Sequence, residues 1–302
     1  LINAGEVYSA GRAAISGAYG FYQDVTITGG VINSDSASLT QGSNSTLVIS
    51  GGEFGADVTL NGTTTITGGV FSSSFTQKGT AEITGGTFKG DVMFTMPDKL
   101  TLGENVTFEN EPVYNDVKIG GNYYLDLATA VSSAKENAKI VVLRDTEVTG
   151  ETLVINKSLI IDLNGHRLNT SQRINNQGVL TVIDSSAEKS GYIFNNRTNI
   201  FYNTGLLTIE EGNYEGARSQ YLIYNSGLDA KVIINNGNYK NHFNEAAYGI
   251  YNTAGTIDFN NGMMNISSIG SSSYGIVNNG VFNLNGGIIN VDTQSTSSSS
   301  YS

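Results

Sequence analysis

The sequence predicts an all-β protein in which the chain winds as a parallel β-helix. Its 37 Gly against 2 Pro, with only 14% charged residues, are typical of turn-rich β structure. Short strand-like motifs recur along most of the chain at intervals of roughly two dozen residues or fewer, and such a period with loops of uneven length is typical of a solenoid. Leucine-rich repeats share the period but need a regular Leu pattern and a helical side, which this sequence lacks. In a parallel β-helix each turn lies about 4.8 Å above the last, so equivalent residues form columns.

One motif occurs four times in the first third of the chain, as VTITGGVI, LVISGGEF, TTITGGVF and AEITGGTF. The first glycines of the four pairs are Gly29, Gly51, Gly68 and Gly85, and the last two intervals between them are equal. Glycine adopts the positive φ of a tight corner without strain. We therefore expect residues 1–112 to form a first β-helix segment, the C-terminal part of a longer solenoid, with a Gly-Gly corner in each turn.

The middle of the chain interrupts these repeats. The run VYNDVKIGGNY (113–123) predicts a small hairpin that turns through Gly120–Gly121. The run DLATAVSSAKENA (126–138) predicts a helix with Asp126 as its N-cap. Its apolar face would hold Leu127, Val131, Ala134 and Ala138. Such a helix could cover unpaired strand edges at the start of a new solenoid, so residues 113–302 are expected to form a second, capped β-helix.

The C-terminal half repeats a longer unit, LTIEEGNY, VIINNGNY, IDFNNGMM and FNLNGGII. Its anchors recur at a constant interval and are Ile209, Ile234, Phe259 and Leu284. We expect them to form an inward apolar column, with a second interior column of Tyr214, Tyr239, Met264 and Ile289. A preceding motif ends in Asn203, Asn225, Asn252 and Asn278, which predict an amide ladder at a bend, each side chain bonded to the next turn.

The same preceding motif supplies the candidate binding residues. Phe201, Ile223, Ile250 and Ile276 point inward if strand alternation holds. Their neighbours Tyr202, Tyr224 and Tyr251 then point outward on three successive turns, and Val277 ends the stripe. Exposed aromatic rings in a row could bind the faces of sugars or a protein partner. The alternatives are that a loop covers the rings, or that tyrosine is present because it suits strands.

Catalytic residues are not predicted, although three groups are the nearest candidates: Asp162 with His166, Arg144–Asp145, and Glu210–Glu211. Each lies at a strand end or turn, where a structural role is the simpler interpretation. His166 and His242 lie far apart in the sequence, outside any metal-ligand spacing. We therefore expect no metal and no cofactor. The alternative is a polysaccharide lyase or glycoside hydrolase, including a phage tailspike-like enzyme, whose site is dispersed over several turns.

Charge and hydropathy restrict the partners. A formal net charge of −11 argues against nucleic acid, which needs a dense basic face. No apolar run approaches the roughly 20 residues that span a bilayer, so no membrane insertion is expected. The absence of Cys excludes disulfides and thiolate metal sites.

One part of the chain resembles a known class of module. Tyr123–Tyr124, LATAV, IVVLRDTEV and IIDLNGHRL, in that order, resemble the opening of pectin-lyase-like right-handed β-helix modules in large surface proteins of gut Gram-positive bacteria. The TITGGVF repeats resemble the same class. The resemblance implies a right-handed helix and an extracellular or cell-surface, adhesin-like module that is a fragment of a larger secreted protein. The partners it implies are host or bacterial glycans or a surface protein.

Overall fold

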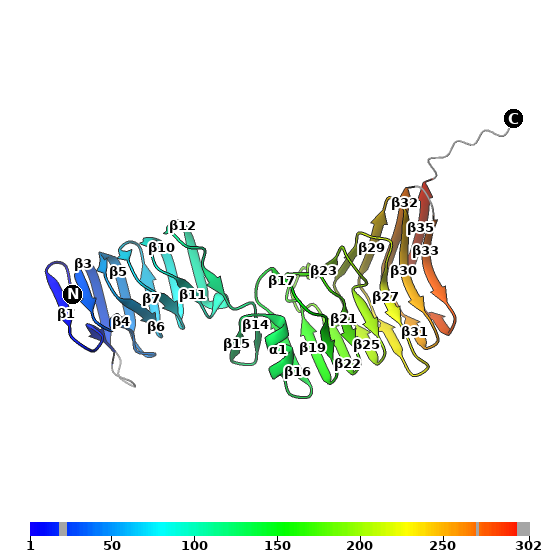
Figure 1. Ribbon diagram of the computed structural model, residues 1–302, viewed down its shortest axis with the longest axis horizontal. Coiled ribbons are helices and arrows are strands. Elements are labelled where there is room, and N and C mark those ends of the chain that lie inside the picture. The colour runs from blue at the N-terminus through cyan, green and yellow to red at the C-terminus, as the bar shows by residue number, and fades with distance from the viewer. Residues whose placement is uncertain (18–22, 270–271, 295–302) are drawn as a thin grey trace. The chain divides into compact units, whose positions relative to one another are not determined.

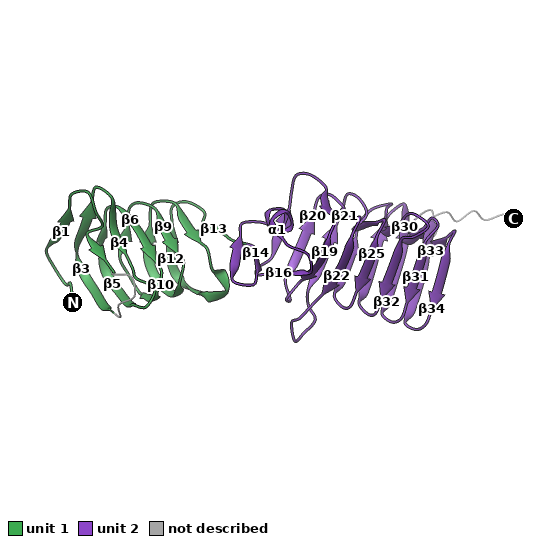
Figure 2. Cartoon of the chain, turned by 90° about the horizontal axis from the view of Figure 1, so that it is seen from below, with its two compact units in different colours: residues 1–115 green, residues 116–302 purple. Residues whose placement is uncertain are grey.

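The computed structural model describes residues 1–17, 23–269 and 272–294. The chain divides into two compact units, residues 1–115 and 116–302 (Figure 2). It forms a parallel β-solenoid of about 13 turns, with 58% strand and 3% helix, which confirms the predicted all-β class and architecture.

Unit 1 is built from two parallel sheets, to which successive turns contribute in order (Figure 1). The seven-stranded sheet contains β1 (Glu6–Ser9), β3 (Asp24–Ser34), β5 (Thr46–Phe54), β7 (Thr63–Ile66), β8 (Val70–Phe71), β10 (Thr80–Phe88) and β12 (Leu100–Phe108). The six-stranded sheet contains β2 (Ile15–Ser16), β4 (Ala37–Thr40), β6 (Asp57–Leu60), β9 (Phe75–Gln77), β11 (Val92–Phe94) and β13 (Val113–Tyr114). A short 3-10 helix, η1 (Pro97–Lys99), precedes β12.

The paired glycines of unit 1 form the predicted corners. The second glycine of each pair has φ of 90°, 106°, 114° and 120° at Gly30, Gly52, Gly69 and Gly86. The first glycine is needed for a different reason: a Cβ on Gly68 would lie 2.5 Å from the carbonyl oxygen of Ser50 in the preceding turn. Glycine is favoured where φ is positive, and it is also favoured where the backbones of two turns approach this closely.

The core of unit 1 contains a column of phenylalanine rings beside its aliphatic side chains. Phe54, Phe71, Phe88 and Phe108 stack in order, with centroid separations of 4.8, 4.6 and 5.2 Å. The spacing of the turns matches the stacking distance of aromatic rings, so identical residues at one position can stack from turn to turn.

Unit 2 is built from three sheets, and each full turn adds one strand to each. The nine-stranded sheet contains β15 (Asn122–Tyr124), β14 (Val117–Ile119), β16 (Ala138–Val142), β19 (Ser158–Asp162), β22 (Val179–Ile183), β25 (Leu206–Ile209), β28 (Lys231–Ile234), β31 (Thr256–Phe259) and β34 (Val281–Leu284). The seven-stranded sheet of unit 2 contains β17 (Thr146–Val148), β20 (Arg167–Thr170), β23 (Tyr192–Asn195), β26 (Asn213–Gly216), β29 (Asn238–Phe243), β32 (Met263–Ile269) and β35 (Ile288–Gln294). The six-stranded sheet of unit 2 contains β18 (Leu153–Ile155), β21 (Ile174–Asn176), β24 (Phe201–Asn203), β27 (Tyr221–Asn225), β30 (Ala246–Asn252) and β33 (Ser272–Asn278).

A hairpin and a helix begin unit 2. β14 and β15 pair antiparallel across Gly120–Gly121, as predicted, but the hairpin begins at Val117, and Val113–Tyr114 instead pair with β11. β14 also pairs antiparallel with β16, the first parallel strand of this sheet. This pairing supplies hydrogen-bond partners to the edge of β16 that faces away from the later turns. The single α-helix of the described residues, α1 (Leu127–Ser133), lies beside β14 and β16 (Figure 1).

The helix is shorter than the predicted 126–138 because its C-terminal end is fixed early. Asp126 is the N-cap, and its Oδ1 accepts from the Thr129 N–H at 2.7 Å. At the other end, Lys157 Nζ donates to the carbonyl oxygens of Val131 (3.3 Å) and Ala134 (2.9 Å). A cation there satisfies carbonyl groups that the helix leaves unpaired. The chain can therefore turn into β16, which contains Ala138.

The predicted interior columns of unit 2 are confirmed in register. β25, β28, β31 and β34 align Ile209, Ile234, Phe259 and Leu284. The first three are fully buried, and so are Tyr214, Tyr239 and Met264 of the second column. Leu284 is instead 58% exposed and Ile289 is only partly buried, because β34 and β35 are the last strands of their sheets in the described chain.

Replacing Gly262 with Ala is expected to destabilise unit 2. Gly262 has φ of 114°, and a Cβ there would lie 2.6 Å from the carbonyl oxygen of Gly237. Left-handed strain and the clash together should cost about 2 kcal/mol, measured by chemical denaturation of the whole chain. The matched control is Gly121→Ala in the hairpin, where nothing lies within 4 Å of the added atom. Equal stability of the two variants would contradict the positive φ and the close contact at Gly262.

Candidate functional site

A buried asparagine ladder fixes one end of the six-stranded sheet of unit 2. Each Nδ2 donates to the Oδ1 of the next turn, at 2.7, 2.7, 2.9 and 2.7 Å along Asn176, Asn203, Asn225, Asn252 and Asn278. The ladder confirms the prediction and extends it by one residue, Asn176. It begins there because the preceding turn has Ile155 at the aligned position. Within the described chain, Asn176 Oδ1 accepts no hydrogen bond.

Two columns of tyrosine lie on the outer face of this sheet. The first contains the predicted Tyr202, Tyr224 and Tyr251, aligned in register and half-buried. The second was missed by sequence analysis and contains Tyr221, Tyr248 and Tyr274. We call these six residues the tyrosine surface.

The second column lies three residues before the first, a spacing that strict alternation would place on opposite faces. The structure departs from alternation in between. Leu222 and Ile223 are both buried in β27, as are Gly249 and Ile250 in β30, so both flanking tyrosines point outward. The repeated Tyr-x-x-Tyr spacing in YLIYN and YGIYN was the available signal.

The rings of the tyrosine surface pack mainly against one another. Tyr202 stacks on Tyr224 with centroids 5.2 Å apart, and Tyr248 stacks on Tyr274 at 5.6 Å. Tyr221 joins the columns, 4.7 Å from the Tyr248 ring and 5.0 Å from the Tyr251 ring. Stacking covers ring faces and leaves ring edges and hydroxyls for a ligand. The sequence instead predicted open ring faces.

The phenol groups influence one another's ionisation. Burial, followed by the neighbouring phenols of Tyr248 and Tyr251, raises the pKa of Tyr221. Burial, then Tyr251 and Tyr202, raises the pKa of Tyr224. Because both pKa values rise from an ordinary value of 10.0, these hydroxyls stay protonated at neutral pH. A protonated phenol both donates and accepts hydrogen bonds.

A cation covers one end of the tyrosine surface. The Arg173 guanidinium lies 4.4 Å from the centroid of the Tyr202 ring. This cation–π contact occupies the ring face that Tyr224 does not cover. The result is an array of phenol hydroxyls and ring edges that spans four turns and packs against itself.

Asp162, a catalytic candidate in the sequence, is fully buried at the end of β19. Its Oδ1 accepts from the N–H groups of Asn164 (3.1 Å) and Ser185 (2.9 Å), and Lys139 Nζ lies 2.6 Å from Oδ2. Burial disfavours the carboxylate, but Lys139 and Ser185 outweigh it and lower its pKa. The ion therefore stabilises the fold above the ordinary carboxyl pKa, and this contribution is lost as pH falls.

Arg144, Asp145 and His166 are not brought together into one acid–base set. Arg144 Nη1 lies 3.3 Å from Asp116 Oδ1, and Thr146 Oγ1 also donates to that carboxylate. Asp145 is exposed, accepts from the Arg167 N–H at 2.8 Å, and lies 3.5 Å from His166 Nδ1. These contacts join neighbouring turns at strand ends.

Glu210 and Glu211 begin outer polar ladders. Asn235 Nδ2 donates to Glu210 Oε2 at 2.9 Å, and Asn236 Nδ2 donates to Glu211 Oε2 at 3.1 Å. The first ladder continues through Asn260 and Asn285, at 2.8 and 2.7 Å. Both carboxylates thus join successive turns, at a turn of the chain for which the sequence predicts a structural role.

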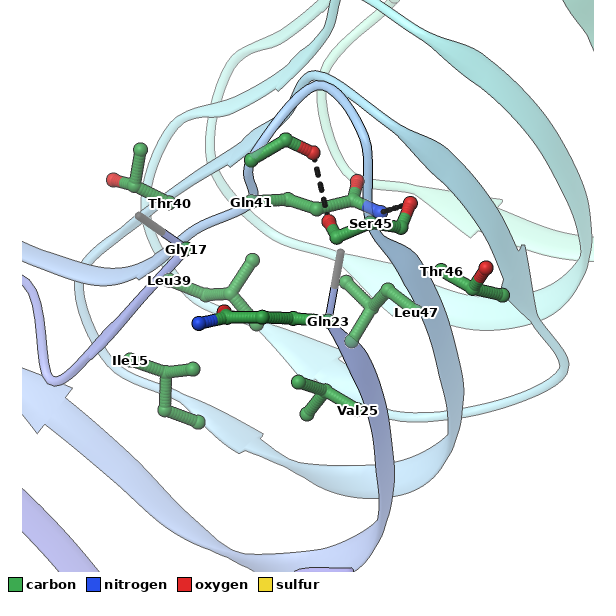
Figure 3. Close-up of a pocket in the computed structure, with 11 residues that line it drawn as sticks. Ile15, Gly17, Gln23, Val25, Leu39, Thr40, Gln41, Ser45, Thr46 and Leu47 are labelled. Carbon is green, nitrogen blue, oxygen red and sulfur yellow. Dashed lines mark hydrogen bonds between the residues drawn. The ribbon is translucent and has the colours of Figure 1, made fainter. Parts of the chain in front are cut away.

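A recess in unit 1 is too small to be a ligand site. Ile15, Val25, Leu39 and Leu47 supply apolar walls (Figure 3). Gln41 crosses it, and its Nε2 donates to the carbonyl oxygen of Ser45 at 3.0 Å. The cavity volume is about 20 Å³, which is room for about one water molecule.

Neither a metal cluster nor a membrane helix is found where the structure describes the chain. Residues 1–17, 23–269 and 272–294 contain no group of three or more His, Cys, Asp or Glu that could hold a metal ion. Over the same ranges no helix has the length and apolar character required to cross a bilayer.

No family model, curated protein or solved structure matches the chain. The class to which it belongs is therefore defined by its own fold, a parallel β-solenoid with one short helix.

Proposed function

We propose that the chain is a non-catalytic adhesive module of a secreted or cell-surface bacterial protein. Its turns serve as a rigid stalk, and the tyrosine surface binds glycans. The observation that carries this proposal is the register of six tyrosines in two outward columns, with their rings packed against one another.

The kind of ligand follows from what the tyrosine surface offers. Stacked rings present hydroxyls and edges, and a hydroxyl that both donates and accepts matches the hydroxyls of a sugar. The rings are ordered by mutual stacking before any ligand arrives. Little side-chain entropy is then lost on binding. A neutral glycan lying along the solenoid axis would contact several turns at once.

Display outside the cell is supported by resemblance. The LATAV, IVVLRDTEV and IIDLNGHRL runs resemble pectin-lyase-like modules of bacterial surface proteins, and these runs form α1, the β16–β17 segment and the β19–β20 segment at the start of unit 2.

Replacing Tyr202, Tyr224 and Tyr251 with Phe is expected to weaken glycan binding while the chain keeps its melting temperature. Phenylalanine retains the stacking but removes the hydroxyls, whereas alanine would also remove stacking contacts, each of about 0.5–1.5 kcal/mol. Glycan-array screening of the wild type identifies a ligand, and calorimetry compares the variants. An affinity loss of about tenfold or more is expected from three lost hydrogen bonds.

The matched control carries Thr181→Val and Thr208→Val, which remove hydroxyls from the outer face of the nine-stranded sheet on neighbouring turns. Its affinity should equal that of the wild type. Unchanged binding by the Phe variant would remove the tyrosine surface from the proposal. Reducing-sugar assays run in parallel: cleavage products from the wild type would replace the binding role with the alternative of a polysaccharide-degrading enzyme.

A further inference from the structure

A hollow on the outer face of the seven-stranded sheet of unit 2 gathers three of the chain's six arginines. It lies over β17, β20 and β23 and the loops that follow β20, β23 and β26. We call it the arginine hollow; its lining is Glu147, Arg167, Asn169, Thr170, Ser171, Phe194, Asn196, Arg197 and Arg218. It is distinct from the tyrosine surface, which lies on the six-stranded sheet.

Arg167 is held over two aromatic rings. Its guanidinium carbon lies 4.8 Å from the Tyr192 centroid and 4.9 Å from the Phe194 centroid. Arg167 Nε donates to Asn169 Oδ1 at 2.7 Å. The planar head is thereby held in place, and no described residue bonds to its two terminal nitrogens, so both can meet a partner in a forked geometry.

Buried asparagines position the loops that carry the other two arginines. Asn195, 1% exposed, accepts from the Arg197 N–H through Oδ1 at 2.8 Å. Asn241, fully buried, donates from Nδ2 to the carbonyl oxygen of Arg218 at 3.2 Å and to that of Gln220 at 2.8 Å. Arg218 Nε also donates to the carbonyl oxygen of Asn196 at 2.6 Å. Hydrogen bonds from the buried asparagines therefore fix the backbone positions from which both arginine side chains extend.

The positive charge of the hollow is not neutralised by carboxylates. None of its arginines forms a salt bridge with another described residue. Glu147 is the one acidic residue in the lining, so three arginines leave a net charge of +2. Nearby Glu215 accepts from the Tyr192 hydroxyl and lies 3.9 Å from Lys240 Nζ. Asp145 accepts from the backbone N–H of Arg167.

We propose that the arginine hollow binds a saccharide that carries carboxylate or sulfate groups. Guanidinium groups bind both anions through paired, charge-assisted hydrogen bonds. Asn169, Asn196 and Ser171 supply the amide and hydroxyl groups that bind sugar hydroxyls. β20 and β23 are paired on both sides, so an acidic peptide could not bind by adding a strand. A locally basic site on a chain of net charge −11 also favours a discrete anionic unit over a long polyanion.

The test uses the full chain and four probes: hyaluronan octasaccharide (carboxylate), sulfated dextran oligosaccharide (sulfate), neutral dextran and hexaglutamate. Isothermal calorimetry at about 50 and 300 mM NaCl reports binding and its screening by salt. The variant carries Arg167→Gln, Arg197→Gln and Arg218→Gln. The control removes equal charge at exposed Lys78, Lys89 and Lys135, each replaced with Gln. Melting temperatures verify folding of both.

We expect one or both charged saccharides to bind, more weakly at the higher salt, and neutral dextran not to bind. The arginine variant should lose about tenfold or more in affinity, and the lysine control less than about twofold. The hyaluronan and sulfated-dextran arms show which anion is preferred. Equal losses in the two variants, an unaffected arginine variant, stronger binding of hexaglutamate, or no binding of either charged saccharide would each overturn the proposal. The Tyr→Phe variants leave the arginine hollow intact, so loss of glycan binding at the tyrosine surface and loss of anion binding at the hollow can be measured independently.

Discussion

Replacing Ile234 with Asp is expected to unfold unit 2 under conditions in which the wild type is folded. Ile234 is fully buried in β28, between Ile209 and Phe259 of the adjacent turns. An aspartate there would bury a charge among apolar side chains and remove the packing of both neighbours. The free energy of unfolding should fall by about 4 kcal/mol or more, and the melting temperature by about 10 °C or more.

The matched control is Thr208→Asp, an outward residue of the neighbouring strand β25. It introduces the same charge on the same sheet, but into solvent, and the melting temperature should change by no more than about 2 °C. Thermal melting of the full chain, followed by circular dichroism, compares the two. A variant at Ile234 that melts with the wild type would contradict the assigned interior face.

Replacing Asn225 with Asp should be almost as damaging, and the damage should depend on pH. Asn225 is fully buried, and its Nδ2 donates to Asn252 Oδ1 at 2.9 Å and to the carbonyl oxygen of Ala230 at 3.3 Å. A carboxylate would replace the donating Nδ2 with a second oxygen, which would face the oxygens of Asn252 and Ala230 without a proton between them. At pH 7 the expected loss of stability is about 3–5 kcal/mol.

The sign of the pH dependence follows from the environment of that carboxyl. Burial and facing acceptors raise its pKa in the folded state above the unfolded value, so the folded variant binds the extra proton. The penalty is largest above the folded pKa and shrinks as pH falls toward the ordinary value of about 4. The melting-temperature difference from wild type should therefore be smaller at pH 4 than at pH 7.

Asn278→Asp provides the control at the exposed end of the same ladder. Its Oδ1 accepts from Asn252 Nδ2 at 2.7 Å, and a carboxylate can still accept there. Little change in stability is expected at either pH. A pH-independent loss in the Asn225 variant, or equal losses at both positions, would show that the ladder's buried donors do not stabilise the turns.

The interior of unit 2 was predictable because a solenoid repeats one environment. Residues one repeat apart occupy the same position in successive turns, so the pattern at Ile209, Ile234 and Phe259 is visible without coordinates. The asparagine ladder was predictable for the same reason. The helix was predicted too long because its end depends on Lys157, which reaches the helix carbonyl groups from the bend between β18 and β19.

The candidate sites were less accessible to sequence reasoning. Half of the tyrosine surface was missed, because a local departure from alternation in β27 and β30 turns Tyr221 and Tyr248 outward. The arginine hollow was not foreseen at all. Arg167, Arg197 and Arg218 lie on different turns at unequal intervals in the sequence, and no repeat links them.

The sequence by itself determined the fold class, the corners, the interior columns and the ladder. Each depends on residues that recur with the turn, and any turn must bury its apolar face against the next. Only the tertiary structure decided which ring faces are free, where the helix ends, and which charges meet on one surface. These depend on side chains from different turns that are brought together by stacking, with positions set by local irregularities that leave no periodic signal in the sequence.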